Sequence, residues 1–384
     1  MISAQHIREF EERATPFYFY DLKTLSDIVD RAKASSDRFG YHLHYALKAN
    51  SNDPILKLMK EKGLGADCVS GGEVSKALEI GFNSNDIAFA GVGKTDKEIN
   101  LAIENNIFSI NVESIEELRV IEHFAALKNK KVRIALRLNP DVDAQTHHYI
   151  TTGLEENKFG ISGWQINEVL EFMQSSSFLL LEGLHFHIGS QIKSLEPFRN
   201  LCGRINNIQE LFEEKGFRIK HINAGGGLGI DYQSPDSSTD PDFERFFSVF
   251  NDLLELRPGQ ELHFELGRSL VANCGDLISR VLYVKQGLKT NFLILDAGMT
   301  ELIRPALYQS VHSIENLSER SSKSEAVYDV VGPVCESSDC FGKAFRLKES
   351  KRGDLIAIRS AGAYGETMSS HYNLRKLEES LYID

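Results

Sequence analysis

Short apolar runs alternate with longer amphipathic segments between residues 41 and 266. The runs are rich in β-branched and aromatic residues, which is typical of strands, and the segments between them have helical periodicity. The predicted strands are Tyr41–Leu47, Gly65–Val69, Asp86–Ala90, Phe108–Val112, Val132–Asn139, Leu180–Ile188, Ile219–Ala224 and Leu262–Leu266. The predicted helices include Pro54–Lys62, Gly72–Ile80, Lys97–Asn105, Ile115–Leu127, Pro197–Lys215 and Phe243–Leu256.

Strands that alternate with helices predict a parallel sheet, and eight of them predict a closed (β/α)8 TIM-like barrel. An open doubly wound sheet is the alternative, but eight units in about 225 residues suit a closed barrel better. After Leu266, strand-like runs follow one another without long helices: Leu277–Gln286, Phe292–Asp296, Ala326–Val331 and Leu355–Ser360. They predict a mostly antiparallel β domain, with which Phe17–Tyr20 could pair. We expect a barrel domain over 22–266 and a second domain made of 1–21 and 267–384.

Composition and charge restrict the function classes. The chain has 384 residues, 42% of them hydrophobic, and a formal net charge of −12. An acidic surface argues against nucleic-acid or anionic-membrane binding, and no stretch approaches the ~20 apolar residues of a membrane span. The polar start, Met1 to Pro16, is unlike a signal peptide, and five scattered cysteines do not suggest a disulfide framework. We expect a cytoplasmic protein without a metal site, since Cys335 and Cys340 have no second ligand pair.

Two kinds of chemical group follow the predicted strands. Lys48 ends the first strand, where a partly desolvated amine can act as a nucleophile; a solvated lysine at the end of a strand is the plainer interpretation. The seventh strand ends in Gly225-Gly226-Gly227-Leu228-Gly229, and the eighth in Glu265-Leu266-Gly267-Arg268. In a barrel, the loops after strands seven and eight often hold phosphate, and consecutive glycines expose backbone N–H groups to an anion. These loops therefore predict a phosphate site, although either could be a simple tight turn.

His185 and His187 share one face at the end of the sixth strand. Such a pair could bind a metal, which would make the protein a metal-dependent barrel hydrolase, but a lysine and a phosphate site do not suit that chemistry. We expect His185 to be a packed core residue. His187 is followed by Ser190, whose hydroxyl could bind phosphate. A lysine, a phosphate site, an imidazole and a carboxylate together are what pyridoxal 5'-phosphate (PLP) requires.

In this interpretation Lys48 binds the PLP aldehyde, Gly226 and Gly227 hold the phosphate, and His187 stacks on the ring. Glu265 would keep the pyridine nitrogen protonated, which favours decarboxylation. Asp67, at the end of the second strand, is expected either to bond near Lys48 or to cap the next helix.

The combination of motifs resembles the fold-type III PLP enzymes, the alanine racemase and ornithine decarboxylase group, and in particular the diaminopimelate decarboxylases. The resemblance extends from about Pro16 to Asn373. It rests on the segments Tyr45–Asn50, His185–Gln191, Gly225–Gly229, Glu265–Ser269, Asp296–Tyr308, Gly332–Asp339 and Gly362–Asn373. One departure is Leu266, where relatives often have proline. The resemblance implies decarboxylation of meso-2,6-diaminopimelate to L-lysine and carbon dioxide, the last step of lysine synthesis.

The resemblance also implies roles for single residues. The substrate has a second amino-acid head that does not react. Arg268, Arg304 and Tyr308 would hold the carboxylate of this head, because arginine pairs bidentately with carboxylates. Glu336 would hold its ammonium group. Cys335 resembles the family's proton donor, with a buried structural thiol as the alternative. Tyr364 resembles an aromatic residue that touches both cofactor and substrate. In the family the Cys335 segment enters the neighbouring subunit's site, which implies a homodimer.

Three alternatives stay open. A carboxynorspermidine, ornithine or arginine decarboxylase would share the cofactor site, and assays on different substrates would separate them. A PLP-binding protein that consists of the barrel alone would share Lys48 but not Cys335 and Tyr364. The metal hydrolase would contain zinc and no chromophore. The long polar connection Pro140–Ser162 is expected to have a functional role, because loops of this length usually do unless they are disordered.

Overall fold

The computed structural model describes residues 2–142, 158–237, 241–318 and 324–383. The chain divides into two compact units, which are described separately. The barrel unit consists of Ile28–Gly229 and Pro241–Gly267, and the β unit of Met1–Asp27, Ile230–Asp240 and Arg268–Asp384. The segment 230–240 therefore groups with the β unit, although it lies within the range expected for the barrel domain. The boundaries drawn from the sequence stay a prediction.

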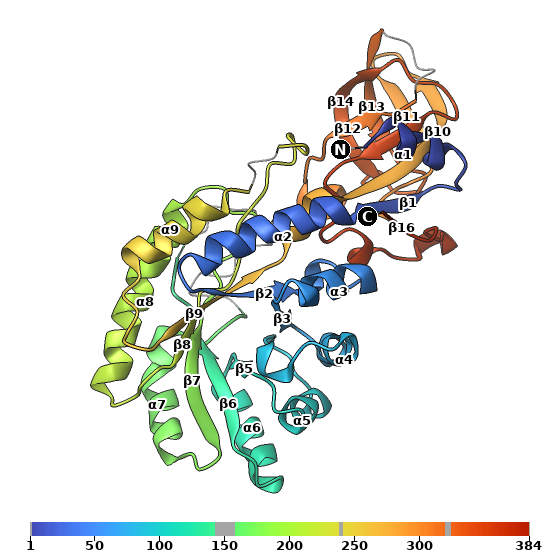
Figure 1. The fold of residues 1–384 in the computed structure, drawn as a ribbon. Helices are drawn as coiled ribbons and strands as arrows, with labels where there is room; N and C mark the ends of the chain where they lie inside the picture. The colour runs from blue at the N-terminus through green and yellow to red at the C-terminus, as the bar shows by residue number, and fades with distance from the viewer. Residues whose placement is uncertain (1, 143–157, 238–240, 319–323, 384) are drawn as a thin grey trace. The chain divides into compact units, whose positions relative to one another are not determined.

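The barrel unit is a closed barrel of eight parallel strands in sequence order, β2 to β9 (Figure 1). The strands are β2 (His42–Ala46), β3 (Gly65–Cys68), β4 (Ile87–Phe89), β5 (Ser109–Val112), β6 (Val132–Arg137), β7 (Leu179–His185), β8 (His221–Asn223) and β9 (Glu261–Leu266). The barrel closes where β9 pairs with β2. This confirms the fold class predicted from the sequence.

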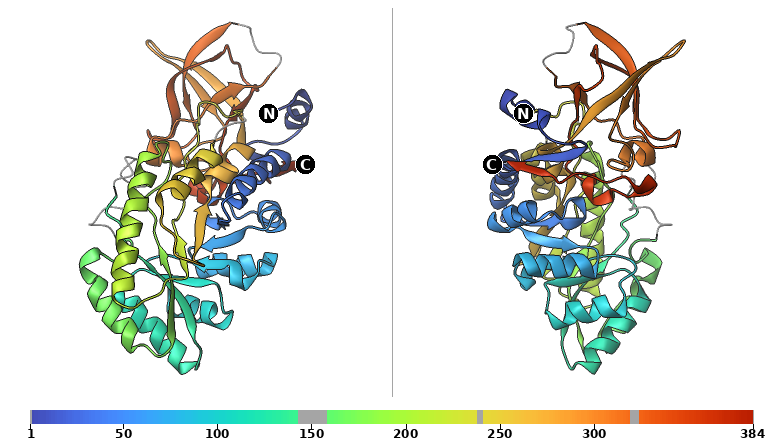
Figure 2. Two further views of the ribbon diagram at one scale, coloured as in Figure 1. Left: turned by 60° about the vertical axis from the view of Figure 1, so that its left-hand side comes forward. Right: turned by 90° about the vertical axis from the view of Figure 1, so that its right-hand side faces the viewer.

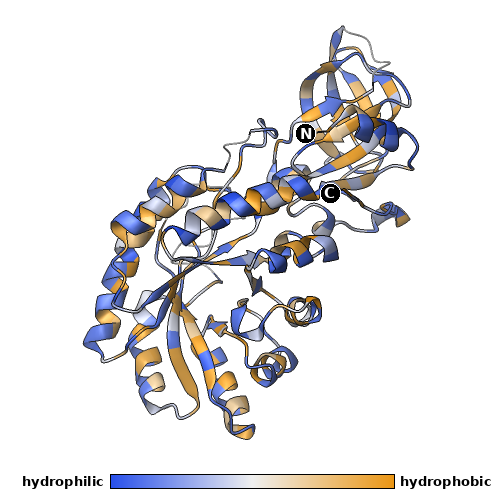
Figure 3. Ribbon diagram, viewed as in Figure 1, coloured by the Kyte–Doolittle hydropathy of each residue, from blue (hydrophilic) through white to orange (hydrophobic). Residues whose placement is uncertain are grey.

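Helices cover the outside of the barrel (Figure 2). They include α3 (Asp53–Glu61), α4 (Gly71–Ile80), α5 (Asp96–Glu104), α6 (Ile115–Leu127), α7 (Ile166–Ser175), α8 (Glu196–Glu214) and α9 (Phe243–Leu253). Many begin where the sequence supplies a cap: Ser70, Thr95 and Ser114 each accept a hydrogen bond from a backbone N–H of the first turn. The helices carry both apolar and polar residues, as amphipathic helices on a barrel must (Figure 3).

The β unit is built on a mostly antiparallel sheet, which also confirms the prediction. Its main path runs in the order β12-β15-β10-β11-β13-β14, and β1 pairs antiparallel with β10. The strands are β1 (Phe17–Asp21), β10 (Gly275–Gln286), β11 (Asn291–Leu295), β12 (Ile314–Asn316), β13 (Glu325–Val331), β14 (Cys340–Lys348), β15 (Leu355–Ile358) and β16 (Leu381–Ile383). Two pairs are parallel, β1 with β16 and β11 with β13. The unit also contains α1 (Ala4–Glu11), α10 (Arg268–Val271) and α11 (Arg304–Tyr308).

The sequence missed several elements. Helix α2 (Leu22–Asp37) and helix α7 were not predicted, and neither were strands β12, β14 and β16. Strand β14 lies at the end of the sheet path and is largely exposed, so it lacks the apolar run by which a strand is recognised. Most of the connection Pro140–Ser162 lies outside the described residues, and its expected role stays a prediction.

Two further expectations concern helices and cysteines. Within the described residues, no helix is both long enough and apolar enough to cross a membrane. All five cysteines fall in the described ranges and are free thiols. Cys68, Cys202 and Cys274 are buried, Cys340 is partly buried and Cys335 is exposed.

Candidate active site

Lys48 lies directly after β2, in the single turn Leu47–Ala49. Its Nζ is 3.0 Å from Oδ2 of Asp67, a fully buried residue of β3. The next helix, α4, is capped by Ser70, so Asp67 is not its cap. Burial and the charge of Glu265 raise the pKa of Asp67, whereas Lys48 lowers it. The structure thus places an amine and a carboxylate together at the carboxyl end of the barrel, where TIM-barrel active sites lie.

Glu265, on β9, is a buried carboxylate with three donors. His185 donates from Nε2 to Oε2 over 3.0 Å, while Asn223 and Asn111 donate to Oε1 over 2.7 and 3.4 Å. Burial by itself raises the pKa of Glu265, but the charges of His185 and Lys48 outweigh it and hold the pKa well below its usual range. The carboxylate is therefore ionised, so it can accept a proton-bearing ring nitrogen.

The glycine loop after β8 has no room for side chains. A Cβ on Gly226 would lie 1.9 Å from the carbonyl oxygen of Glu265, and one on Gly227 would lie 2.6 Å from that of Gly189. Gly227 also has a φ of +101°, which favours glycine. The chain therefore keeps its bare backbone close to the ends of β7 and β9, as a phosphate-binding loop requires.

His187 follows β7 and faces this loop. Its Nδ1 accepts a hydrogen bond of 3.3 Å from the backbone N–H of Gly226. Burial and the charges of Lys48 and Arg137 lower the pKa of His187 well below its usual value, so the imidazole is neutral. A neutral aromatic ring can stack on a pyridine ring without adding charge. Ser190 is partly buried three residues further on.

These groups fit pyridoxal phosphate. The barrel unit offers a nucleophilic amine, an ionised buried carboxylate, a neutral ring and a glycine loop, which match the aldehyde, the pyridine nitrogen, the ring and the phosphate. Asp67 Oδ1 and His185 Nδ1 are buried polar atoms without a hydrogen-bond partner among the described residues. Buried polar atoms are normally hydrogen-bonded, so these two atoms are consistent with a polar ligand in the barrel.

A second group of residues lies in the β unit. The guanidinium of Arg268, in α10, donates from Nη1 to the hydroxyl of Tyr232 over 2.6 Å, and the group lies 4.8 Å from the centre of the Tyr364 ring. The guanidinium of Arg304, in α11, lies 4.8 Å from the centre of the Tyr232 ring. Tyr232 therefore joins two buried arginines, which together can bind a carboxylate.

Two further residues, His312 and Tyr308, interact with this arginine pair. His312 accepts from Nη1 of Arg304 through Nε2 over 3.0 Å and donates from Nδ1 to the carbonyl oxygen of Arg359 over 2.8 Å. Burial and the charge of Arg304 lower the pKa of His312 to about 3, so the ring stays neutral and keeps its acceptor. Tyr308, at the end of α11, is partly buried and is among the groups that raise the pKa of Arg268 after burial has lowered it.

Cys335 and Glu336 lie in the connection between β13 and β14. Both are exposed, and the Glu336 carboxylate accepts a hydrogen bond of 2.9 Å from the hydroxyl of Tyr372. Tyr364 has a φ of +55°, an uncommon conformation for a bulky residue, and its ring lies beside the Arg268 guanidinium. An exposed thiol contradicts the alternative that Cys335 is a buried structural residue.

Comparison with known proteins decides the family. Residues 25–272 match the family model described as "Pyridoxal-dependent decarboxylase, pyridoxal binding domain". A diaminopimelate decarboxylase of Bacteroides thetaiotaomicron is 53% identical over 379 residues, which cover 98% of both chains. The chain belongs to the diaminopimelate decarboxylase family. It is therefore a PLP-dependent lyase, and the predicted cofactor and enzyme class are confirmed.

Solved structures agree with the family. The crystal structure of diaminopimelate decarboxylase from Helicobacter pylori complexed with L-lysine has a TM-score of 0.92 and 39% identity, covering 99% of this chain and 94% of that one. The structure of diaminopimelate decarboxylase from M. jannaschii in co-complex with L-lysine has a TM-score of 0.89 and 33% identity, covering 98% of this chain and 89% of that one.

Some residues around the predicted groups were missed from the sequence. Tyr232 and His312, which hold the arginines, lie in stretches without a motif. Asn223 is the last residue of β8 and Asn111 the last but one of β5, and a polar residue at such a position was a usable signal. His185, expected to be only a core residue, is buried but also bonds to Glu265.

Proposed function

We propose that this member of the family decarboxylates meso-2,6-diaminopimelate to L-lysine and carbon dioxide, the last step of lysine synthesis. The observation that carries the proposal is the buried pair Arg268 and Arg304 on Tyr232, because a substrate with a second amino-acid head brings a second carboxylate. The 53% identity to a diaminopimelate decarboxylase supports the same substrate. Ornithine and lysine have no second carboxylate and would leave this cationic site unfilled.

The barrel residues would hold the cofactor. We assign the phosphate to Gly226, Gly227, Gly267 and the Ser190 hydroxyl, and the ring to the neutral imidazole of His187. When bound, PLP supplies an aldehyde that combines with an amine and a protonated ring that accepts the electron pair left by departing carbon dioxide.

Three side chains would then control protons and charge. The Lys48 amine is the attachment point, and Asp67 holds it 3.0 Å away. Asp67, whose pKa is raised, can share a proton with this amine as substrate enters and product leaves. Glu265 stays ionised at neutral pH and so keeps the proton on the ring nitrogen.

The β-unit residues would select the substrate. Arg268, Arg304 and Tyr308 would bind the carboxylate that stays on the product, and Glu336 its ammonium group. Tyr364 would contact both cofactor and substrate. This head is unchanged in the reaction, so its contacts supply binding and orientation rather than acceleration of the chemical step.

Cys335 would return a proton to Cα after carbon dioxide leaves. The thiol and Glu336 are exposed in the single chain, as expected for groups that complete the site of a second copy. We therefore propose a homodimer with shared active sites. A cytoplasmic location fits a biosynthetic enzyme with free thiols.

The deciding experiment is carbon dioxide release from meso-diaminopimelate, with and without added PLP, compared with ornithine, arginine and lysine. We expect release that depends on PLP and is specific for diaminopimelate. Lys48→Ala should lose both activity and the visible absorbance of the bound cofactor. Lys57→Ala replaces an exposed lysine of α3; it is the matched control and should keep both. Equal turnover of ornithine would contradict the substrate, whereas an unchanged spectrum in Lys48→Ala would contradict the role of the lysine.

A further inference from the structure

The amino end of the barrel contains a second cluster of polar side chains, at the opposite end from Lys48. His42 and Glu261 are the first residues of the neighbouring strands β2 and β9 (Figure 1). His42 and His263 are register partners in this parallel pair, and their rings stack with centres 4.6 Å apart. Because paired residues on adjacent strands face the same side, the two imidazoles and the Glu261 carboxylate are near one another.

The ligand atoms are close enough to share an ion after small side-chain rotations. One nitrogen from each histidine and one Glu261 oxygen all lie within 4.8 Å of one another. His42 and Glu261 are exposed and can adjust, whereas the His263 side chain is only 5% exposed and is fixed. The three line a hollow of about 560 Å³, which gives an ion from solvent access to them.

A chain of hydrogen bonds sets the tautomer of His263. The carbonyl oxygen of Asp86 can only accept, so His44 donates to it from Nδ1 over 3.1 Å. His44 Nε2 is then an acceptor, so His263 donates a hydrogen bond to it from Nδ1 over 2.9 Å. The neutral His263 consequently presents the lone pair of Nε2 to the cluster. An imidazole whose other nitrogen donates into the protein is the usual arrangement of a metal-bound histidine.

This lone pair faces another acceptor. His263 Nε2 lies 3.4 Å from the Glu261 carboxylate. In the tautomer that the hydrogen bond to His44 sets, neither atom has a proton to offer the other. A cation placed between the two acceptors satisfies both.

We propose that His42, Glu261 and His263 bind one divalent transition-metal ion of the zinc type at the amino end of the barrel. Imidazole nitrogen and carboxylate oxygen are ligands that zinc accepts, and three protein ligands leave one position for water. The ion would join the first and last strands of the barrel where the sheet closes, so it would stabilise the barrel unit. The site could not be predicted from the sequence. Its ligands come from β2 and β9, which are neighbours in space but far apart along the chain, and the hydrophobic pattern does not single out their positions.

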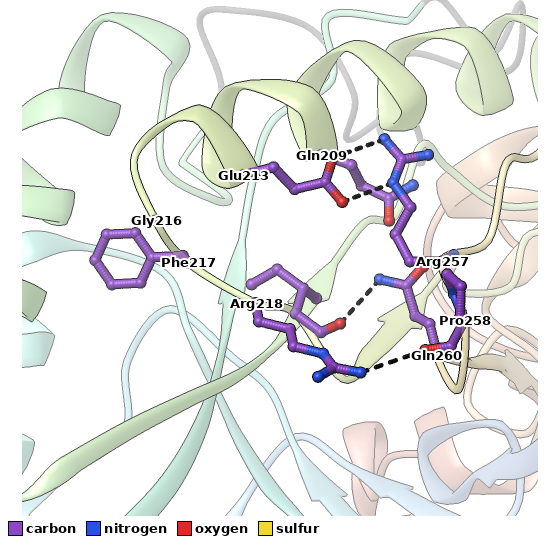
Figure 4. Close-up of a pocket in the computed structure, with 9 residues that line it drawn as sticks. Gln209, Glu213, Gly216, Phe217, Arg218, Arg257, Pro258 and Gln260 are labelled. Carbon is purple, nitrogen blue, oxygen red and sulfur yellow. Dashed lines mark hydrogen bonds and ion pairs between the residues drawn. The ribbon is translucent and has the colours of Figure 1, made fainter.

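A second hollow of about 580 Å³, lined by Arg218 and Arg257, is a poor candidate for an anion site (Figure 4). Its two arginines already have partners. Arg257 pairs with Glu213 at 2.7 Å, and Arg218 donates to the carbonyl oxygen of Pro258 over 3.5 Å. An anion would have to compete with these contacts.

The test is a zinc titration of the PLP-loaded protein at pH 7.5, in competition with a chromogenic chelator. We expect one zinc equivalent whose affinity falls at least about tenfold in His42→Gln and in Glu261→Gln. His123→Gln, an exposed histidine on α6, is the matched control and should bind zinc as the unmodified protein does. Because all four proteins keep Cys335 and the cofactor site, zinc bound there cannot produce a difference between them.

Thermal unfolding supplies the second measurement. Zinc at about 100 times its dissociation constant should raise the unfolding temperature of the unmodified protein and of His123→Gln by roughly 5 °C. The shift should be much smaller in the two ligand variants. The proposal is overturned if the four proteins bind zinc equally, or if none binds it. Neither result would bear on the decarboxylase function, which the carbon dioxide assay tests separately.

Discussion

Tyr232→Phe tests the proposed carboxylate site with the loss of a single oxygen atom. In the structure the Tyr232 hydroxyl accepts a 2.6 Å hydrogen bond from Arg268, while the ring lies under the guanidinium of Arg304. Phenylalanine keeps the ring, its volume and the contact with Arg304. The substitution therefore removes only the hydroxyl, which accepts from Arg268 and also opposes the lowering of the Arg304 pKa by burial.

The size of the effect follows from this bond. A hydrogen bond to a charged group contributes about 1.5–3 kcal/mol, and about 1.4 kcal/mol corresponds to a factor of ten. Arg268 itself remains, so we expect the lower end, a rise of about tenfold in KM for meso-diaminopimelate. The kcat value should change little, because the carboxylate held there is bound equally in the ground state and the transition state.

Steady-state kinetics should be measured together with PLP affinity, which we expect to be unchanged. Tyr18→Phe is the matched control, since this buried tyrosine of the same unit donates to the carbonyl oxygen of Glu301 over 2.9 Å instead of accepting from an arginine there. It should lower stability by about 1 kcal/mol without altering KM. If Tyr232→Phe also lowers stability while KM stays the same, Tyr232 is a structural residue and the reasoning is wrong.

Three other variants test different parts of the structure. Gly226→Ala places a Cβ 1.9 Å from a carbonyl oxygen, so it should lower stability by about 1–3 kcal/mol and weaken PLP binding about tenfold in equilibrium dialysis. Gly203→Ala, with open space around the new Cβ, should change neither property. Cys335→Ala should reduce turnover by about a hundredfold or more while PLP binding persists, whereas Cys340→Ala should keep both, and equal loss of both properties in Cys335→Ala would contradict a proton donor. The pKa of His312 is about 3 in the folded protein and 6.5 in the unfolded chain, so its contribution to stability is present above pH 6.5 and is lost as the pH falls, by about 1.4 kcal/mol per pH unit. His312→Asn should therefore make the protein less sensitive to acid. Between pH 7 and pH 5, the free energy of unfolding measured in urea should fall by about 2 kcal/mol less in this variant than in the unmodified protein. An equal fall in both proteins would show that His312 is not a source of the acid sensitivity.

Much of the barrel could be predicted because its signal is local. Parallel barrel strands are buried on both faces and are rich in apolar residues, as in Val132–Arg137 and Leu262–Leu266. The helices between them repeat with helical periodicity and often begin at a capping residue. An exposed strand such as β14 has neither signal, because it borders solvent and its side chains need not be apolar.

The candidate site divides in the same way. The sequence alone identified Lys48, the glycine loop and Glu265, because each directly follows or ends a strand and has a side chain or backbone with distinctive chemistry. It could not identify Tyr232 or His312, whose roles depend on contacts with Arg268 and Arg304 that no motif in the sequence indicates. The sequence therefore determined the fold class and the chemistry that the strand ends can supply. Only the tertiary structure decided protonation and orientation, since burial and distant partners set the charge of Glu265, the tautomer of His263 and the direction of Arg268.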